Sequence, residues 1–109
     1  MDKPKIWLSS PHMGGNEKQY VDDAFSSNWI APLGPNVTGF ENDIVSYLSN
    51  EVYVGALSSG TAALHLGLIL LDVKLGDEVL CQSMTFSASA NPIVYLGAKT
   101  IFKDSEKDT

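Results

Sequence analysis

Residues 52–68 read VYVGALSSGTAALHLGL, and the three parts of this stretch predict a strand, a tight turn and a helix. The first six residues are apolar and partly β-branched, which is typical of a buried parallel strand. The turn at residues 58–61 leads directly into an apolar, helix-like run. Such a corner offers free backbone N–H groups, hydroxyl groups and the positive end of a helix dipole, so it is a candidate phosphate site.

The same corner also has an interpretation that needs no ligand. Ser or Thr at the start of a helix caps its first backbone N–H groups, and glycine permits a tight turn. The sequence has no G-x-G-x-x-G, Walker A, C-x-x-C or H-E-x-x-H motif that would add specificity, so both interpretations stay open. For the same reason we expect no metal site.

Strand-like and helix-like segments alternate after the corner. The predicted segments are a helix over 61–71, a strand over 78–83, a helix over 86–96 and a strand over 100–102. Pro92 either disturbs the second of these helices or marks a start nearer Asn91, and the pattern does not decide between them. Together with residues 52–57 the series is βαβαβ, which predicts an α/β fold with a parallel sheet and right-handed crossovers.

Two helices are expected before this series. Apolar residues recur at helical spacing between residues 20 and 25, and Asn16 is a candidate N-cap. Two prolines and a glycine predict a loop over 29–36, after which a second amphipathic helix follows over 37–48.

The chain is therefore divided into a helical lead-in, residues 1–51, and a βαβαβ part, residues 52–109. Parallel sheets have helices on both faces and usually contain more than three strands. Two lead-in helices cover only part of such a sheet, so we expect this sequence to be an incomplete part of a larger domain.

Composition excludes several classes of function. The 109 residues are 44% hydrophobic and 18% charged, with a net charge of −6, seven lysines and no arginine. An acidic chain without arginine argues against a nucleic-acid partner. No apolar run approaches the roughly 20 residues that span a bilayer, so we expect no membrane partner. The single cysteine indicates a reducing, cytoplasmic setting.

Ligands of α/β sheets bind at the carboxyl ends of the strands, and three loops meet that description: residues 58–61, residues 83–86, and Asp104 onward. Thr85 and Phe86 add a hydroxyl and an aromatic ring, so a small aromatic phosphate is a candidate ligand. Phe86 also fits a place in the core, and Asp104 fits a turn or a cap.

Two further residues in the strand and helix segments have a structural interpretation. We expect His65 to be a buried, hydrogen-bonded histidine within the apolar helix and not a ligand-binding residue. Cys81 lies in the middle of a predicted strand, where we expect it to be a small hydrophobic core residue.

The order of the motifs resembles the start of the sugar-nucleotide aminotransferases of the DegT/DnrJ/StrS group. These are pyridoxal-phosphate (PLP) enzymes with the aspartate-aminotransferase fold. The motifs are NWIAPLGPNV at 28–37, FE at 40–41, SSGTAALHL at 58–66, GDEV at 76–79, TFSASANPI at 85–93 and GA at 97–98. The resemblance covers the chain from about Ile6 onward and implies the first part of the large PLP-binding domain.

The resemblance assigns roles to individual positions. The cofactor phosphate would bind at Ser59, Gly60, Thr61 and Ala62. Phe86, beside Thr85, would stack on the pyridine ring. The loop that begins at Trp29 would lie near the substrate in a homodimer, with Trp29 and Thr85 as substrate-facing residues.

The implied reaction transfers an amino group, usually from glutamate, to a nucleotide-linked keto-sugar for polysaccharide or related glycan synthesis. Members of the family are several times longer than this sequence. Their Schiff-base lysine, the acidic partner of the pyridine nitrogen and the small domain lie beyond the matching region, and none of the seven lysines here occupies a matching position. The resemblance therefore implies that this chain alone is inactive.

Two other functions remain open from the sequence. The first is a non-catalytic binding or assembly piece that folds only against a partner chain, since an unpaired parallel edge strand tends to associate. The second is one half of a nucleotide-binding dehydrogenase, which the missing glycine fingerprint disfavours.

Overall fold

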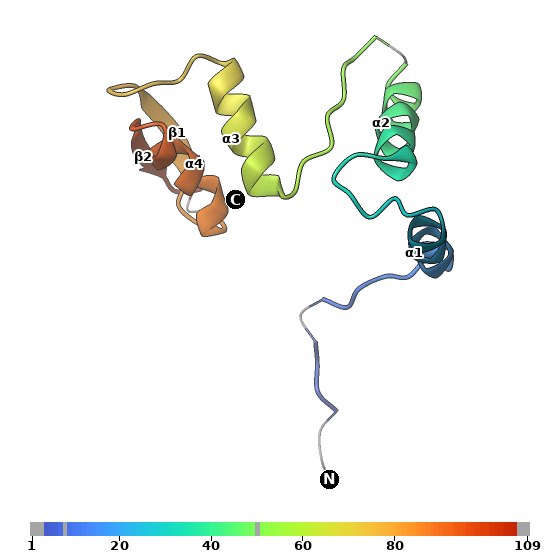
Figure 1. Cartoon of the computed structure of the whole chain (residues 1–109). Helices are drawn as coiled ribbons and strands as arrows, with labels where there is room; N and C mark the ends of the chain where they lie inside the picture. The colour runs from blue at the N-terminus through green and yellow to red at the C-terminus, as the bar shows by residue number, and fades with distance from the viewer. Residues whose placement is uncertain (1–3, 8, 50, 107–109) are drawn as a thin grey trace. The chain divides into compact units, whose positions relative to one another are not determined.

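The computed structural model describes residues 4–7, 9–49 and 51–106 (Figure 1). The chain divides into two compact units, the first ending at Ala56 and the second beginning at Leu57. The first unit contains helices α1 (Glu17–Ser26) and α2 (Pro35–Tyr47). The second contains α3 (Gly60–Leu70), β1 (Glu78–Gln82), the 3₁₀ turn η1 (Ser87–Ser89), α4 (Asn91–Tyr95) and β2 (Lys99–Lys103). The α/β class predicted from the sequence is confirmed.

Helix α1 begins where two glycines end the preceding loop. Asn16 occupies the N-cap position as predicted, but its side chain makes no capping hydrogen bond. The Glu17 carboxylate instead accepts hydrogen bonds from the backbone N–H groups of Gly14 and Gly15, the latter at 2.8 Å. An acidic side chain at this end also suits the helix dipole. A residue other than the predicted one thus satisfies the N–H groups that precede the helix.

Helix α2 begins at Pro35, two residues before its predicted start at residue 37. Proline suits a first helical turn because its missing N–H would have no intrahelical partner there. The preceding Gly34 packs closely on Trp29, since a Cβ at Gly34 would lie 3.1 Å from Trp29 Cε3. The Asn36 side chain donates a hydrogen bond of 3.5 Å to the Tyr20 carbonyl and joins α2 to α1.

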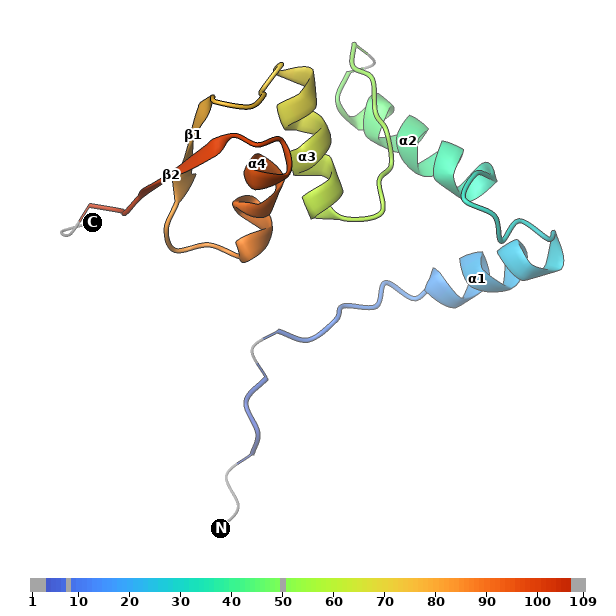
Figure 2. The same ribbon diagram turned by 60° about the vertical axis from the view of Figure 1, so that its left-hand side comes forward.

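The second unit is built on two parallel strands. β1 and β2 pair in register from Glu78 opposite Lys99 to Gln82 opposite Lys103, which confirms the predicted parallel pairing of these strands. Helix α4 lies between α3 and the strand pair (Figure 2). Among the described residues, the buried apolar core consists of Cys81, Ile93 and Ala98, with Pro92 fully buried beside them.

The segment predicted as one helix over 86–96 is divided in two. η1 is followed by α4, which starts at Asn91 with Pro92 in its first turn. The second of the two alternatives left open for Pro92 is therefore correct. Gly97 ends the helix with φ +72°, and a Cβ there would lie 3.0 Å from Leu75 Cδ1. A turn of this conformation and tightness requires glycine.

The strand predicted over residues 52–57 is absent from the structure, and this prediction is wrong. These residues form neither helix nor strand, and the Tyr53 side chain is fully exposed. A parallel strand forms only against a neighbouring strand, and within the described residues the sheet contains β1 and β2 alone. The backbone N–H of Ala56 donates instead to the Glu41 carboxylate, at 2.8 Å.

Membrane-spanning helices and metal clusters are both absent from the part of the chain that the structure describes. It contains no helix long and apolar enough to cross a bilayer, and its longest helix, α2, has 13 residues. The same residues contain no group of three or more His, Cys, Asp or Glu side chains placed to hold a metal ion.

Candidate functional site

The start of α3 is a capped helix terminus with two free donors. Ser59 has an extended backbone, and its hydroxyl oxygen accepts a hydrogen bond of 3.2 Å from the backbone N–H of Ala62. The N–H of Ala63 donates to the Ser59 carbonyl at 3.1 Å. Within the described residues, the N–H groups of Gly60 and Thr61 have no hydrogen-bond partner. The corner is therefore capped and still presents two N–H groups at the positive end of the dipole.

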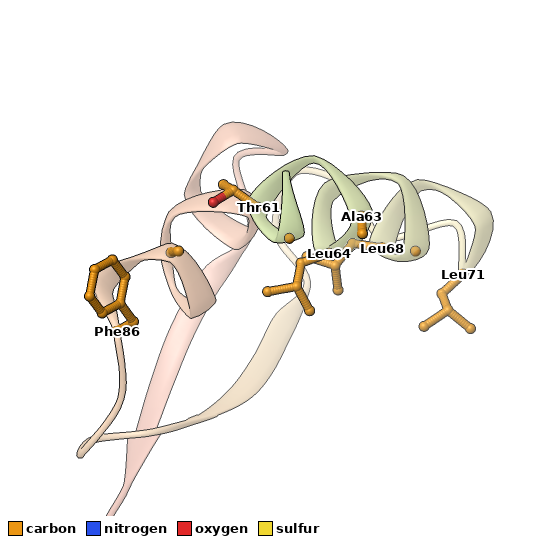
Figure 3. Close-up of a pocket in the computed structure, with 9 residues that line it drawn as sticks. Thr61, Ala63, Leu64, Leu68, Leu71 and Phe86 are labelled. Atoms are coloured by element: carbon orange, nitrogen blue, oxygen red, sulfur yellow. The ribbon is translucent and has the colours of Figure 1, made fainter. Parts of the chain in front are cut away.

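An open hollow of about 780 Å³ runs along one side of α3 (Figure 3). It is lined by Gly60, Thr61, Ala63, Leu64, Gly67, Leu68, Leu71, Phe86 and Ala88. Thr61 and Phe86 lie toward one end of it, and Leu71, which directly follows α3, lies at the other, with Leu64 and Leu68 between them. The structure thus brings together two of the predicted site residues, a hydroxyl group and an aromatic ring, beside the free N–H groups of the helix terminus. Ser59 and Ala62 do not line the hollow.

Phe86 lies on the loop between β1 and η1, and its side chain is 83% exposed. The interpretation of Phe86 as a core residue is therefore wrong for this structure. The residues after Phe86 form a tight turn, in which the backbone N–H of Ser89 donates to the Phe86 carbonyl at 2.9 Å. The Thr85 hydroxyl lies 2.9 Å from the Ser89 hydroxyl and is hydrogen-bonded to it.

The carboxyl ends of the two strands are joined by a contact that the sequence reasoning missed. The Ser83 hydroxyl donates a hydrogen bond of 3.1 Å to Asp104 Oδ1, and the same oxygen accepts from the N–H of Ser105 at 3.0 Å. The sequence shows polar residues at the ends of both strands, but it contains no signal of the register in which the two strands pair. Asp104 lies in no assigned turn and at no helix start, so the turn or cap expected of it stays a prediction.

The other singled-out residues lie outside the hollow. His65 is half-buried, and its ring meets Tyr95 edge-on with centroids 5.5 Å apart. Cys81 is 9% exposed and belongs to the core, as predicted. Trp29 lies in the first unit, on Gly34.

The lysines of the described ranges are all solvent-exposed: Lys5, Lys18, Lys74, Lys99 and Lys103. Three of them form surface ion pairs at 2.7–2.9 Å: Lys18 with Asp22, Lys74 with Asp72, and Lys99 with Glu78. A lysine that forms a covalent bond with a carbonyl group needs a pKa lowered by burial. None of these five has such surroundings, and none lines the hollow.

The model of the DegT/DnrJ/EryC1/StrS aminotransferase family matches residues 11–109. EpsN of Bacillus subtilis strain 168, named as a candidate pyridoxal phosphate-dependent aminotransferase, is 55% identical over 105 residues, which are 96% of this chain and 27% of EpsN. GDP-perosamine synthase of Escherichia coli O157:H7 is 42% identical, over 95% of this chain and 28% of that protein.

A solved structure is similar over the same region. It is the PLP form of Spr1654 from Streptococcus pneumoniae, named as a candidate sugar aminotransferase. The two structures superpose with a TM-score of 0.83 and 36% sequence identity, over 95% of this chain and 26% of that one. The chain thus spans about a quarter of the length of the relatives it matches, and its fold is that of the corresponding part of a PLP-dependent aminotransferase.

Proposed function

The chain belongs to the DegT/DnrJ/EryC1/StrS aminotransferase family, and from this we propose that the protein transfers an amino group to a nucleotide-linked keto-sugar. We propose glutamate as the amino donor, PLP as the cofactor and polysaccharide or glycan synthesis as the role. The names of the relatives support this proposal, since they include a GDP-perosamine synthase and a PLP-form sugar aminotransferase.

One observation carries the cofactor proposal. The free N–H groups of Gly60 and Thr61 lie at the end of the hollow that Phe86 also lines. PLP is a small aromatic ring with a phosphate, and a helix terminus beside an exposed ring suits both parts. When bound, PLP supplies the electron sink for amino-group transfer.

The residues at the start of α3 would each contribute to phosphate binding. Ser59 caps the helix and fixes the direction of its first N–H groups. Gly60 has open space where a Cβ would lie, so an anion can approach its backbone closely. Thr61 adds a hydroxyl donor at the hollow. Ala62 has its N–H engaged by Ser59, so its proposed role is limited to the backbone of the terminus.

The side chains along the hollow would hold and shield the ring. Phe86 would stack on it, which contributes roughly 0.5–1.5 kcal/mol beyond buried area. Leu64 and Leu68 line the same hollow and would exclude water beside the ring. Trp29 and Thr85 are proposed to face the substrate.

The remaining proposals concern the whole protein. We propose a homodimer, supported by the family resemblance, and a cytoplasmic location, supported by the single unpaired cysteine. The division into a lead-in of residues 1–51 and the first part of the large PLP-binding domain, residues 52–109, also stays a proposal.

PLP binding by the protein at its natural full length tests the cofactor site. We expect a change in the absorbance of added PLP, and a loss of affinity of about fivefold to 150-fold in a Thr61→Ala/Phe86→Ala double variant, which removes one hydrogen bond and one stacked ring. The matched control is Phe25→Ala/Thr38→Ala, which deletes the same kinds of side chain from α1 and α2.

The reaction itself is tested by incubating the protein with PLP, glutamate and a nucleotide-linked keto-sugar, with mass spectrometry of the product. We expect an aminated nucleotide sugar from the wild type and from the control variant. Equal PLP affinities in the Thr61→Ala/Phe86→Ala variant and in the wild type would refute the assignment of the site. PLP binding without any aminated product would leave the site in place and refute the reaction.

A further inference from the structure

The loop that carries Phe86 needs an anchor outside the hollow. Because the Phe86 ring is largely exposed, its own packing does little to fix its direction. The ring position therefore depends on the backbone of the loop, which leaves β1 after Gln82 and reaches η1 at Ser87. What fixes this backbone also fixes the ring.

The end of the loop next to the strands is held by two hydrogen bonds from one residue. The backbone N–H of Ser83 donates to the Lys103 carbonyl at 2.9 Å, which continues the β1–β2 ladder by one step. The Ser83 hydroxyl then donates to Asp104 Oδ1 at 3.1 Å. The main chain and the side chain of Ser83 thus both bind to the end of β2.

The other end of the loop is closed behind the ring by Ser89, which bonds to Thr85 and to the Phe86 carbonyl. Only two residues, Met84 and Thr85, lie between Ser83 and Phe86 along the chain. A loop this short, held at both ends, has few conformations available. At the end next to the strands, the side-chain contact that holds it is the hydrogen bond from Ser83 to Asp104.

We propose that Asp104, acting through Ser83, is a positioning residue that holds the Phe86 ring in place to stack on the cofactor. Asp104 does not line the hollow and does not touch the cofactor site, so its effect is exerted through the loop. This inference rests on the proposed function, because a stacking role for Phe86 requires a flat ring as its ligand.

The first test follows the loop without any cofactor. Chymotrypsin cleaves after exposed aromatic residues, and its rate at a closed site tracks the fraction of open conformations. In the full-length apo protein, we expect Ser83→Ala and Asp104→Ala each to raise the initial rate of cleavage after Phe86 by about twofold to tenfold, the effect of one hydrogen bond. Asp104→Asn keeps an acceptor oxygen and should stay near the wild-type rate.

Two controls separate a local effect from a loss of stability. Ser105→Ala removes a neighbouring hydroxyl that makes no hydrogen bond in the described part of the chain, and it should leave the rate unchanged. Cleavage after Tyr95, on α4, provides an internal reference in the same digest. A rise at Tyr95 equal to that at Phe86 would mean general unfolding and would overturn the proposal.

The second test measures the dissociation constant of PLP in the same full-length variants. We expect Ser83→Ala and Asp104→Ala to weaken binding by about twofold to tenfold, and to have no further effect in a Phe86→Ala background, because coupled residues are not additive. An equal loss with and without Phe86 would overturn the positioning role. The proposal would also be overturned if Ser83→Ala and Asp104→Ala showed the same cleavage rate and the same PLP affinity as Ser105→Ala. Either result would leave the proposed cofactor site in place. Failure of the wild type to bind PLP would instead refute the proposed function, and the stacking role of Phe86 with it.

Discussion

At the scale of single residues, Ser59 both stabilises α3 and shapes the candidate phosphate site. Its hydroxyl satisfies the N–H of Ala62, which leaves the N–H groups of Gly60 and Thr61 for an anion. We expect Ser59→Ala to lower the free energy of unfolding by about 0.5–2 kcal/mol, the usual cost of a lost N-cap. Denaturant titration of the protein at its natural full length measures the change. Ser58→Ala is the matched control, and an equal loss there would count against the cap.

Gly97 is a second residue whose role is set by backbone geometry. Its φ is +72°, and a Cβ added at this position would lie only 3.0 Å from Leu75 Cδ1, so both features oppose a side chain. We expect Gly97→Ala to destabilise the protein by at least about 1 kcal/mol, since a left-handed conformation costs that much outside glycine. Gly39→Ala, in the open middle of α2, should instead stabilise by about 0.5–1 kcal/mol. Thermal denaturation of the two variants at the natural full length compares them, and equal shifts would refute the strain argument.

At the scale of elements, the start of α1 is expected to depend on pH. The pKa of Glu17 lies below its ordinary value of 4.5, because the carboxylate accepts hydrogen bonds from its own backbone N–H and from those of Gly14 and Gly15. A lowered pKa in the folded state means that the stabilisation is present above about pH 4.5 and is lost as the pH falls through the lowered value.

Glu17→Gln provides the test of this dependence, since glutamine keeps an acceptor oxygen but does not titrate in this range. Amide NMR signals of Gly14 and Gly15 should shift between pH 5 and pH 2 in the wild type and stay constant in the variant. Signals that titrate equally in both proteins would show that another group controls this turn.

The elements that the sequence predicted well are those with local signals. Helices α1 and α3 follow from apolar spacing that ends at polar or glycine residues, and Pro92 marks the first turn of α4. Residues 52–57 have an equally clear strand composition, yet they form no strand in the structure. Strand formation depends on a neighbouring strand, which the local sequence does not specify. In this structure the N–H of Ala56 donates to the Glu41 carboxylate instead.

The candidate site was predictable to the same extent. The residue types of Thr61 and Phe86 suit a phosphate and a ring, and their places are local features, the start of a helix for Thr61 and the loop after a strand for Phe86. The bond between Ser83 and Asp104 was not predictable, because it depends on the register of β1 against β2. The exposure of Phe86 was not predictable either, since a phenylalanine side chain is more often buried than exposed.

At the scale of the whole molecule, the second unit buries little apolar surface. Among its described residues, the buried positions are Cys81, Pro92, Ile93 and Ala98. Leu80 lies between two inward-facing residues of β1 and is 69% exposed, so the opposite face of the strand pair is uncovered by the described elements. The leucines of α3 along the hollow are also only partly covered.

This sparse core predicts how the 109 residues behave when they are expressed by themselves. Four small or medium side chains are buried, and Leu68, Val73, Val79 and Ala90 are partly buried against them. This burial is small beside the ordering entropy of a unit of this size, which is about 1–2 kcal/mol per residue for the backbone alone. We therefore expect strong binding of the dye ANS, helical far-UV circular dichroism and no cooperative thermal transition, as in a loosely packed state. The full-length protein is the control and should melt cooperatively with little dye binding. A sharp, dye-free transition of the 109-residue chain would show that it folds independently, and would favour a self-contained binding role over a part of a larger catalytic domain.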